Sequence, residues 1–329
     1  MDSSEFVKKL AKHKFILPPL SGYTDYPFRK ILAKSDSPFI ITEMVSAQAV
    51  IHENKKTMQI LKIAEGKYCK GVQLFGSDPE IMGKAASIVQ GLGFDYIDIN
   101  MGCTIKKVVN KGAGICLMKN EELASLIAGA VVDSVDIPVT CKIRLGLTKT
   151  KMNGLDLSKK LSDVGVAAIA VHGRTGEKKF AMKVDYGQIK EIVDNVPIPI
   201  IANGSVFNAD DAKKMMEKTN AAAVMPGRGI IGNPWIVNEL ESAFSNTKNN
   251  IADLKDRKEI CQQHLDHLTK FYGLRSGVLK MRRILPHYFP KCLNLRELKL
   301  DVHQASYVEE INEMISKIKE VDNCISYDK

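Results

Sequence analysis

The most constraining feature of this 329-residue sequence is a regular alternation, over its first 245 residues, of short apolar runs with helix-like stretches. The runs are rich in valine and isoleucine and are bounded by glycine, proline or asparagine, as strands are. Strands are predicted at Phe15–Leu20, Phe39–Glu43, Gly71–Phe75, Tyr96–Asn100, Val139–Arg144, Ala168–His172, Pro199–Ala202 and Ala222–Met225, and helices at Asp78–Leu92, Asn120–Ser134, Leu155–Val164, Tyr186–Asp194 and Asn208–Lys218. Eight strands with intervening helices predict an α/β fold, a closed TIM (β/α)8 barrel. A doubly wound open sheet is the alternative, and the even spacing disfavours it.

The pattern changes after residue 245, where the polar stretch SNTKNN is typical of a linker. Beyond it, helices are predicted at Ile251–Phe271, Gly277–Tyr288 and Val308–Val321. A TIM barrel takes about 250 residues. We therefore predict two domains: a barrel over residues 1–245 and a small all-helical domain over residues 246–329.

Composition and cysteine spacing limit the class of protein further. The formal net charge is +9, which favours a polyanionic partner. The cysteine count is seven, an odd number, and no pair has CxxC spacing, so neither a disulfide framework nor a structural zinc site is expected. The N-terminus lacks the apolar stretch of a signal peptide, and no apolar run approaches the roughly 18 residues of a membrane span. We expect a cytoplasmic protein, without metal or membrane, and a monomer.

Polar side chains fall at the carboxyl ends of several predicted strands. Because side chains alternate between the two faces of a strand, Gln73, Asn100, Lys142 and His172 are expected to point into the barrel. Arg144 shares the face of Lys142. Barrel enzymes place their catalytic groups at this end. A single polar residue would be an ordinary rim residue, but four from four strands indicate an active site.

Two glycine-containing turns follow the last two predicted strands. These are Asn203-Gly204-Ser205 and Gly227-Arg228-Gly229. Loops at this position commonly hold a phosphate in barrels, because glycine lets backbone N–H groups approach the anion and arginine adds two donors. Either turn alone would be ordinary, and together they predict a phosphorylated cofactor.

Cys103 lies on the loop after the fourth predicted strand, above the expected barrel mouth. Most cysteines without a disulfide are packing residues, and Cys116 and Cys141 are expected to be so. Cys103 has polar neighbours instead. A thiol has an ordinary pKa of about 8.5 and is protonated at neutral pH, so Cys103 can donate a proton.

Motifs across the whole barrel resemble the tRNA-dihydrouridine synthase family, and its bacterial B-type members in particular. They are PPLSGYTDYPFR at residues 18–29, ITEMVSA at 41–47, VQLFGSDP at 72–79, DINMGC at 98–103, KIRLG at 142–146, VHGRT at 171–175, IANGSV at 201–206 and MPGRG at 225–229. They stand in the family's order. The resemblance implies FMN as cofactor, NADPH or NADH as reductant, and uridines of tRNA as substrate.

The resemblance also implies roles for residues. Cys103 would be the catalytic acid. The FMN ring system would contact Gln73, Lys142, His172 and the backbone of Pro19, Leu20 and Ser21, and its phosphate would contact Asn203, Gly204, Ser205, Gly227 and Arg228. Substrate contacts would come from Asn100 and Arg174, and from the C-terminal helices. Apart from the resemblance, Lys106, Lys107 and Arg144 are also predicted to contact the substrate. No GxGxxG motif with a following acidic residue is evident, so the nicotinamide is expected to share the flavin pocket.

Two positions depart from the family pattern. Thr104 stands where proline usually follows the catalytic cysteine, which puts the stiffness of that loop in question. Pro18-Pro19-Leu20-Ser21-Gly22 replaces the usual Ala-Pro-Met-Ala-Gly, a change that conserves volume at Leu20. Little effect is expected from either change.

Basic residues concentrate in one C-terminal segment. Residues 270–299 hold eight basic residues against one acidic residue, a net charge of +7. Tyr272, His287, Tyr288 and Phe289 are interleaved with them, as is typical of RNA-binding surfaces. Arg282 and Arg283, midway along, are predicted to contact tRNA, with Lys106, Lys107, Arg174, Lys178 and Lys179 on the barrel as the alternative surface. A solvated helical face is the plain alternative for any charge run.

Two rival functions remain open from the residues. One is another FMN barrel of the dihydroorotate-dehydrogenase kind, acting on a free pyrimidine, which would not need the basic helical domain. The other is an inactive barrel that only binds RNA, which would not need Cys103, Lys142 and a phosphate site together.

Overall fold

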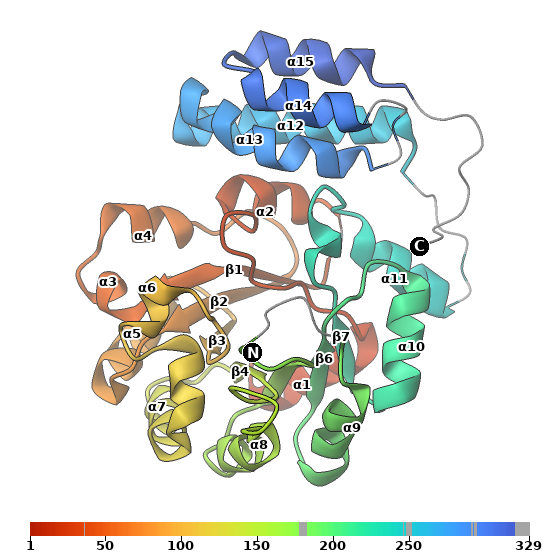
Figure 1. The fold of residues 1–329 in the computed structure, drawn as a ribbon. Coiled ribbons are helices and arrows are strands. Elements are labelled where there is room, and N and C mark those ends of the chain that lie inside the picture. The colour runs from red at the N-terminus through yellow and green to blue at the C-terminus, as the bar shows by residue number, and fades with distance from the viewer. Residues whose placement is uncertain are drawn as a thin grey trace.

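The computed structural model describes residues 1–35, 37–177, 183–245, 247, 252–290, 292 and 295–319. Within them, one parallel sheet runs in chain order through β1 (Phe39–Ser46), β2 (Cys69–Phe75), β3 (Tyr96–Asn100), β4 (Val139–Arg144), β5 (Ala168–His172), β6 (Ile200–Asn203) and β7 (Ala223–Met225). Helices cover the outside of this curled sheet (Figure 1). The fold is a TIM-type barrel, so the predicted fold class is confirmed. The open-sheet alternative is wrong, because the strand order never reverses.

The predicted first strand, Phe15–Leu20, is wrong beyond its first residue. Phe15 forms a single parallel bridge to Val224 of β7, supported by bonds from Ile16 N to Val224 O and from Val224 N to Lys14 O. Pro18 and Pro19 lack the N–H donors that a ladder needs, so pairing stops there. The segment therefore flanks β7 as an irregular stretch and reaches the barrel mouth as a loop.

The register of the sheet collects polar residues at one end. Asn100 is level with Lys142, and Arg144 is level with His172, which in turn is level with Asn203. Deeper in the barrel, Gln73 is level with Asp98. The predicted bounds of β3, β4 and β5 are confirmed. The polar carboxyl ends of the strands therefore meet at the barrel mouth.

The helices of the barrel are α1 (Ser3–His13), α2 (Tyr26–Leu32), α3 (Ala47–Ile51), α4 (Lys55–Ile60), α5 (Pro79–Gly91), α6 (Lys106–Val109), α7 (Glu121–Asp133), α8 (Gly154–Asp163), α9 (Tyr186–Asn195), α10 (Ala209–Thr219) and α11 (Ile236–Ser245), with 3-10 turns η1 (Gly114–Lys119) and η2 (Arg228–Ile230). The five predicted barrel helices agree with the structure to within one residue at each end. Capping side chains set the starts of α5, α7 and α10: Asp78 accepts from Ile81 N, Asn120 from Leu123 N and Asn208 from Asp211 N.

The amino-terminal end of the barrel is closed by α1. Its Phe6 is fully buried and meets Phe39 and Tyr96 with ring centroids 5.4 and 5.2 Å apart. Small and aliphatic strand residues such as Ala168 and Ile201 complete this apolar plug. Solvent access to the barrel interior is therefore confined to the carboxyl end of the strands.

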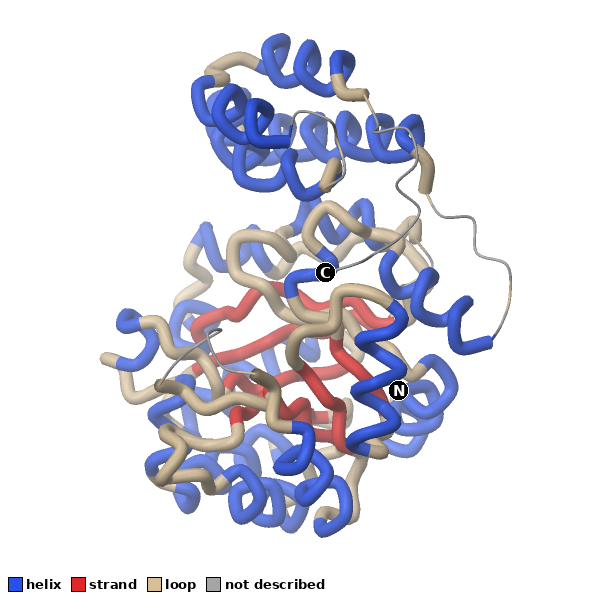
Figure 2. The backbone as a smooth tube through the Cα atoms, turned by 45° about the vertical axis from the view of Figure 1, so that its right-hand side comes forward, coloured by secondary structure: helices blue, strands red, loops and turns tan. Residues whose placement is uncertain are grey.

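In the described part of the chain after the barrel lie the helices α12 (Leu254–Tyr272), α13 (Leu274–Tyr288), α14 (Leu295–Gln304) and α15 (Val308–Lys317). They enclose an apolar core of their own and stack beyond α2 (Figures 1 and 2). Sequence patterns missed α14. Helix α13 begins three residues before its predicted start, and Gly277 within it lets it cross α12 closely, since a Cβ there would lie 2.7 Å from the Cα of Thr269. The domain boundary after residue 245 stays a prediction.

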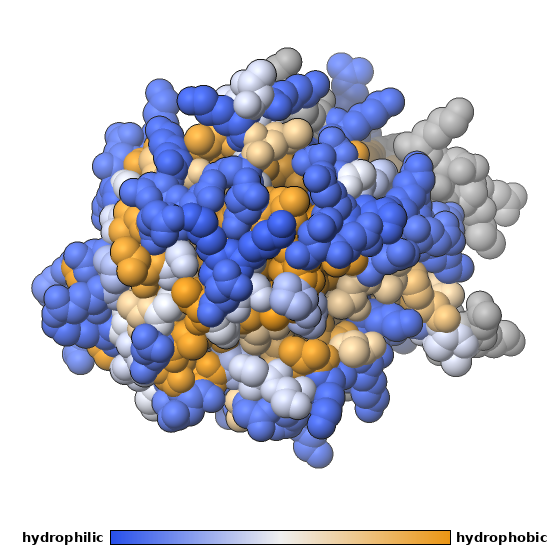
Figure 3. Space-filling view, turned by 90° about the horizontal axis from the view of Figure 1, so that it is seen from below, coloured by the Kyte–Doolittle hydropathy of each residue, from blue (hydrophilic) through white to orange (hydrophobic). Residues whose placement is uncertain are grey.

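Side chains from both parts tie the C-terminal helices to the barrel. Lys280 of α13 forms an ion pair with Asp25, and His264 of α12 stacks on Phe28 of α2 with centroids 5.1 Å apart. Gly232, with φ of +68°, leaves no room for a side chain against the backbone of His287. On the face of the molecule opposite these helices, small apolar groups are interspersed with polar side chains (Figure 3). None of the described helices is both long and apolar enough to cross a membrane.

Candidate active site

A cavity of about 350 Å³ opens at the carboxyl ends of the strands. Every residue predicted to bind the cofactor lines it: Pro19, Leu20, Ser21, Gln73, Lys142, His172, Asn203, Gly204, Ser205, Gly227 and Arg228. Cys103, Asn100, Arg144 and Arg174 line it as well. The sequence motifs thus converge on one cavity, from the carboxyl ends of the barrel strands and from the Pro19–Ser21 loop.

A chain of hydrogen bonds fixes the floor of this cavity. The buried Asp98 carboxylate accepts from Thr140 Oγ1 and from Gln73 Nε2, both at 2.7 Å. This contact orients the Gln73 amide, so its Oε1 accepts from Asn100 Nδ2 at 2.9 Å. Burial, partly opposed by these bonds, raises the pKa of Asp98 to about 6, which leaves it ionised at neutral pH. Sequence reasoning did not single out Asp98 beyond its place in the DINMGC motif, and its role as the anchor of this chain was missed.

The same chain sets the position of the Cys103 loop. Because Asn100 Nδ2 is committed to Gln73, its Oδ1 accepts from the backbone N–H groups of Gly102 and Cys103, at 3.2 and 2.9 Å. Arg144 Nε donates to Gly102 O at 2.8 Å, and Ile115 N donates to Cys103 O at 3.0 Å. Four hydrogen bonds therefore hold the loop, and they supply the stiffness that proline in place of Thr104 would give.

Gly114 makes room for the cysteine. Its φ is +63°, and a Cβ built there would lie 2.7 Å from Cys103 O and 3.1 Å from Cys103 Cβ. No side chain fits without moving the loop. Sequence reasoning did not single out Gly114, although the Gly112-Ala113-Gly114 triplet, with both glycines at positive φ, carried the signal of a special backbone.

The Cys103 thiol is half-buried and protonated. Burial raises its pKa, while a hydrogen bond from the Ile105 backbone and the charge of Arg144 act against this increase. A neutral thiol at the mouth of a cavity is a proton donor rather than a nucleophile. Cys141 is fully buried and Cys116 donates to Val109 O, in agreement with their predicted packing roles. None of the cysteines in the described ranges forms a disulfide.

Lys142 supplies positive charge inside the cavity. Its Nζ donates to Asn203 Oδ1 at 2.9 Å, and Asn203 Nδ2 donates to Met225 O at 2.8 Å, so β4, β6 and β7 together position the ammonium. Burial, chiefly, and the neighbouring Arg144 lower the pKa of Lys142 to about 8, although Asp98 opposes the decrease. Lys142 therefore carries its charge at neutral pH.

His172 is neutral and contacts Arg174. Burial, and then the charges of Lys142, Arg144 and Arg174, hold the pKa of His172 well below its ordinary value. Its Nε2 lies 3.2 Å from Arg174 Nη1 and accepts from it. Arg174 Nη2 donates to Ser205 Oγ at 2.7 Å. The bond between Arg174 and Ser205 fixes the turn after β6. The imidazole of His172 lines the cavity as an uncharged polar group.

The turns after β6 and β7 have the geometry of an anion cradle. Gly204 has φ of +136° and Ser205 has φ of +52°, and both residues line the cavity. A Cβ at Gly227 would meet no atom within 4 Å, so open space lies before this turn. Arg228 begins η2 next to it and lines the cavity. These residues fit a phosphate, since glycine-containing turns let backbone N–H groups approach an anion and the Arg228 guanidinium adds charge-assisted donors.

The predicted tRNA contacts outside the cavity are separated in space. Lys106 and Lys107 are exposed on α6. Arg283 is exposed on α13 with its guanidinium 5.2 Å from the Tyr23 ring centroid, whereas Arg282 is half-buried and donates to Ala305 O at 2.7 Å. These assignments stay predictions, and Lys178 and Lys179 lie outside the described residues.

Two of the aromatic residues expected to stack on bases do not fit that role. Tyr288 is fully buried and its hydroxyl contacts His264 Nδ1 at 3.0 Å, and Phe289 is also buried. Both belong to the core of the C-terminal helices. The stacking expectation is therefore wrong for these two residues, because Tyr288 at the end of α13 and Phe289 just after it pack into that core instead of facing solvent. Tyr272 is half-buried, with Lys280 Nζ 4.3 Å from its ring centroid.

The fold and the site together define a TIM-barrel enzyme with an anion cradle and a protonated thiol at its mouth. The described residues hold no group of side chains suited to a metal ion. A family model described as dihydrouridine synthase matches residues 16–324. The chain belongs to the dihydrouridine synthase family.

Individual relatives agree with this family. The chain is 37% identical over 280 residues to tRNA-dihydrouridine synthase B of Pasteurella multocida (strain Pm70), an alignment covering 84% of each protein. It is 34% identical over 301 residues to tRNA-dihydrouridine synthase B of Shewanella oneidensis, covering 91% of this chain and 93% of the relative.

Solved structures share the barrel at low sequence identity. Morphinone reductase superposes with a TM-score of 0.51 at 12% identity, covering 74% of this chain and 88% of that one. Histamine dehydrogenase from Rhizobium sp. 4-9 superposes with a TM-score of 0.55 at 13% identity, covering 77% of this chain and 49% of that one. At these identities the similarity concerns the fold alone.

Proposed function

We propose that the cavity at the barrel mouth binds FMN and that Cys103 is the acid in the reduction of uridine to 5,6-dihydrouridine in tRNA. The chain is a flavin-dependent oxidoreductase of the dihydrouridine synthase family. The tRNA substrate is supported by the relatives from Pasteurella multocida and Shewanella oneidensis, which are tRNA-dihydrouridine synthases by name.

The polar groups of the cavity suit the two ends of FMN. The turns at Gly204-Ser205 and Gly227-Arg228 would hold its phosphate. Gln73, Lys142 and His172, facing the cavity from three strands, would contact the polar edge of the ring system, with the Pro19–Ser21 backbone on the other side. When bound, FMN supplies the hydride that a C5=C6 double bond must receive.

The chain itself supplies position, charge and the proton. Adding hydride at C6 of uracil leaves the C5 carbon in need of a proton, and the neutral Cys103 thiol would donate it from Sγ. Asn100 and Arg144 keep that thiol in place through the backbone of residues 102 and 103. Lys142 would stabilise negative charge that accumulates on the cofactor during its reduction. Asn100 and Arg174 would lie near the uracil or the tRNA backbone.

NADPH is the reductant in this proposal, with NADH as the alternative, and its nicotinamide would enter the flavin cavity before tRNA does. The positive charges of Lys142, Arg144 and Arg174 within one cavity suit both an anionic cofactor and RNA. The C-terminal helices would add tRNA affinity. A monomer in a reducing cytoplasm completes the proposal.

The observation that carries the proposal is the hydrogen-bonded chain from Asp98 through Gln73 and Asn100 to the Cys103 backbone, at the floor of a cavity with an anion cradle. The test is reconstitution with purified protein. We expect released flavin to be FMN, and dihydrouridine to form in unmodified tRNA with NADPH. Turnover of a free pyrimidine without tRNA would support the dihydroorotate-dehydrogenase-like alternative, and a colourless tRNA-binding protein would support the inactive barrel. Mapping dihydrouridine in tRNA from a deletion strain would identify the position.

A further inference from the structure

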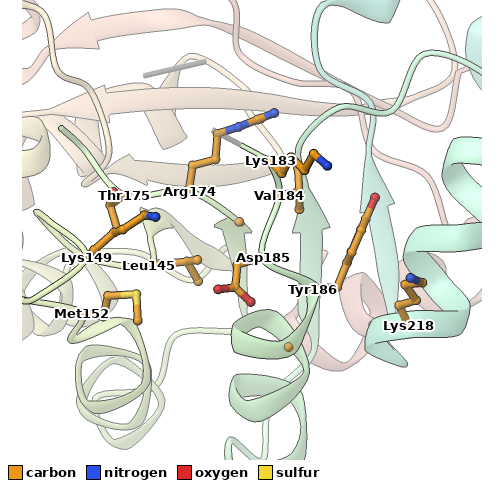
Figure 4. Close-up of a pocket in the computed structure, with 12 residues that line it drawn as sticks. Leu145, Lys149, Met152, Arg174, Thr175, Lys183, Val184, Asp185, Tyr186 and Lys218 are labelled. Atoms are coloured by element: carbon orange, nitrogen blue, oxygen red, sulfur yellow. The ribbon is translucent and has the colours of Figure 1, made fainter. Parts of the chain in front are cut away.

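Parts of the chain outside the strands help to enclose the flavin cavity. On the side of β5, Arg174 lines both this cavity and a neighbouring pocket, in which Tyr186 and Lys149 lie on opposite sides (Figure 4). On the side of β1, the boundary is the loop after Phe15, whose residues Pro19–Ser21 line the cavity. Because this loop belongs to no strand, contacts with other elements must fix its position.

Hydrogen bonds within the loop close residues 20–24 into a compact turn. Tyr23 N and Thr24 N donate to Leu20 O at 3.0 and 2.9 Å, and Leu20 N donates to Thr24 Oγ1 at 3.0 Å. Gly22 lies at the tip of this 20–24 turn with φ of +83°, a conformation that favours glycine. These bonds fix the shape of the turn, so Leu20 and Ser21 keep their place in the cavity when the turn as a whole is held.

Glu43 of β1 holds the tip of the 20–24 turn. Gly22 N donates to Glu43 Oε1 at 2.5 Å, and the Glu43 side chain is half-buried. At the other end of the turn, Arg29 Nη1 donates to Thr24 O at 2.7 Å. The turn is therefore attached to β1 at its tip and to α2 at its end.

A β-bulge gives Glu43 this orientation. Ile41 is level with Gly71 and Met44 is level with Gln73, so β1 has one residue more than β2 over this stretch. In an unbroken ladder Glu43 would be level with Gln73, which lines the cavity. With the bulge, Met44 lines the cavity in its place. The extra residue thus frees the Glu43 carboxylate to reach the turn, as bulges beside active sites do when they redirect a side chain.

The surroundings of the Glu43 carboxylate agree with this contact. Burial raises its pKa, and the hydrogen bond from Gly22 is the strongest influence in the opposite direction. The charge of Asp25 raises the pKa further, whereas the charges of Lys280 and Arg29 lower it. The main polar partner of Glu43 is therefore a backbone N–H group, which a neutral amide oxygen in the same position could also accept from.

We propose that Glu43 is a positioning residue for the flavin, whose bond to Gly22 holds the backbone of Leu20 and Ser21 against the ring system. The inference rests on the proposed function, because it takes FMN as the occupant of the cavity. Glu43 acts through the 20–24 turn and does not touch the cofactor. What the position requires is an acceptor oxygen at the reach of a glutamate side chain, rather than a negative charge.

Two conservative variants separate reach from charge. Glu43→Asp keeps the charge but withdraws the carboxylate from Gly22 by one methylene group, and Glu43→Gln keeps the reach and an acceptor oxygen but is neutral. Leu161→Ala, which removes a fully buried side chain of α8, is the control for a general loss of stability. All variants are made in the full chain.

Two measurements are compared across these variants. Titration of FMN into the flavin-free protein, followed by quenching of flavin fluorescence, gives the affinity for FMN. Hydrogen exchange of the flavin-free protein, followed by mass spectrometry, reports the protection of the segment 18–25. Urea unfolding shows how far each variant is destabilised.

We expect Glu43→Asp to bind FMN at least about tenfold more weakly and to exchange faster in the segment 18–25, because the bond to Gly22 is lost. Glu43→Gln should stay within about threefold of wild type in affinity and should keep the protection. Leu161→Ala should unfold at a lower urea concentration and still bind FMN as wild type does.

Three results would overturn the proposal. One is unchanged FMN affinity in Glu43→Asp, and another is a loss in Glu43→Gln as large as in Glu43→Asp, which would show that the charge is what matters. The third is a loss of affinity in Leu161→Ala equal to that in Glu43→Asp, which would reduce the effect to stability. Failure of the proposed function is distinguishable, since wild type itself would then bind no FMN, while hydrogen exchange would still report whether Glu43 holds the turn.

Discussion

Lys280 Nζ of α13 lies 3.3 Å from Oδ2 of Asp25, a carboxylate only 2% exposed at the start of α2. Burial raises the pKa of Asp25, although the charge of Lys280 and hydrogen bonds from Phe28 and Tyr272 oppose the increase. Asp25 closes the loop that begins at Pro18 and lines the flavin cavity through Pro19–Ser21. The ion pair therefore joins the C-terminal helices to the loop that covers the proposed cofactor.

Removing one partner of this pair should weaken the whole molecule. Breaking a fully buried pair costs about 3–5 kcal/mol, and because Lys280 is 31% exposed we expect about 2 kcal/mol for Lys280→Met. Urea unfolding followed by circular dichroism measures the loss. The double variant Asp25→Asn/Lys280→Met should recover part of it, because no uncompensated charge remains.

A matched control is available on the neighbouring helix. Lys270→Met breaks the exposed pair with Asp266 and should cost less than about 1 kcal/mol. If Lys280→Met and Lys270→Met shift the urea midpoint equally, the Asp25–Lys280 ion pair does not stabilise the protein more than an exposed ion pair does.

The sequence predicted the barrel well because periodicity and caps are local signals. The bounds of β3 to β5 and the starts of α5, α7 and α10 follow from apolar runs and from Asp78, Asn120 and Asn208. The failures concern contacts between distant segments. Pro18 and Pro19 are a local signal that the first strand ends early, but nothing local indicates that Phe15 pairs with Val224, or that Tyr288 is covered by α12.

The sequence predicted which residues line the site, but it did not predict the hydrogen bonds and close contacts between them. Motif order placed Gln73, Asn100 and Cys103 in one cavity. The bonds that orient them depend on Asp98, which lies two residues before Asn100 on β3 and therefore deeper in the barrel. The position of Cys103 also depends on Gly114, which approaches it from a separate loop. These contacts depend on the register between neighbouring strands and on the packing of separate loops, and neither can be deduced from the sequence pattern of one segment.

Gly114→Ala should displace Cys103, although Gly114 itself is not among the residues that line the cavity. The substitution places a methyl group 2.7 Å from Cys103 O and forces alanine to φ of +63°. Since a shift of about 1 Å can cost a hundredfold in rate, we expect dihydrouridine formation to fall by about 10²-fold with FMN retained. Gly91→Ala on α5, where a Cβ meets no atom within 4 Å, is the control and should keep full activity. Equal activity in both variants would show that the loop tolerates the shift.

The charge of Lys142 predicts a pH dependence for flavin reduction. Because burial lowers its pKa to about 8, Lys142 is charged below that pH and becomes neutral as pH rises through it. We expect the rate of reduction by NADPH to fall above pH about 8, and Lys142→Met to be slower by about 10²-fold and flat across this range. Stopped-flow absorbance between pH 6 and 10, a range of about four units around this pKa, measures both profiles. The same inflection in Lys142→Met would assign it to another group.

Arg282 and Arg283 should behave differently although they are adjacent. Arg283 is exposed beside Tyr23, so Arg283→Ala should weaken tRNA binding. It should also reduce the slope of the logarithm of the binding constant against the logarithm of the salt concentration by about 0.7–0.9, the contribution of one phosphate contact. Arg282→Ala loses the bond to Ala305 O and should lower stability by about 1–2 kcal/mol. Binding titrations across a salt series, with FMN content as control, measure the slopes. An unchanged slope in both variants would move the tRNA surface to Lys106, Lys107 and Arg174.

Cys103→Ala should separate the two halves of the reaction. Its thiol is assigned only to proton donation, and the loop is held by backbone groups that the substitution keeps, through Asn100 Oδ1 and Arg144 Nε. We therefore expect normal FMN content, normal tRNA affinity and normal bleaching of the flavin by NADPH. Reoxidation of the reduced flavin by tRNA should slow by about 10²–10⁴-fold, the usual cost of losing a general acid.

Cys103→Ser is the matched variant, because it keeps the size and a donor but raises the pKa of that donor well above that of a thiol. If the assignment is right, its rate of reoxidation should lie between wild type and Cys103→Ala, since a hydroxyl in the same place donates less readily. Single-turnover measurements with pre-reduced enzyme and unmodified tRNA give these rates directly. A wild-type rate of flavin reoxidation in Cys103→Ala would show that another group donates the proton. Slow reduction of the flavin by NADPH in this variant would show that Cys103 acts in flavin reduction instead.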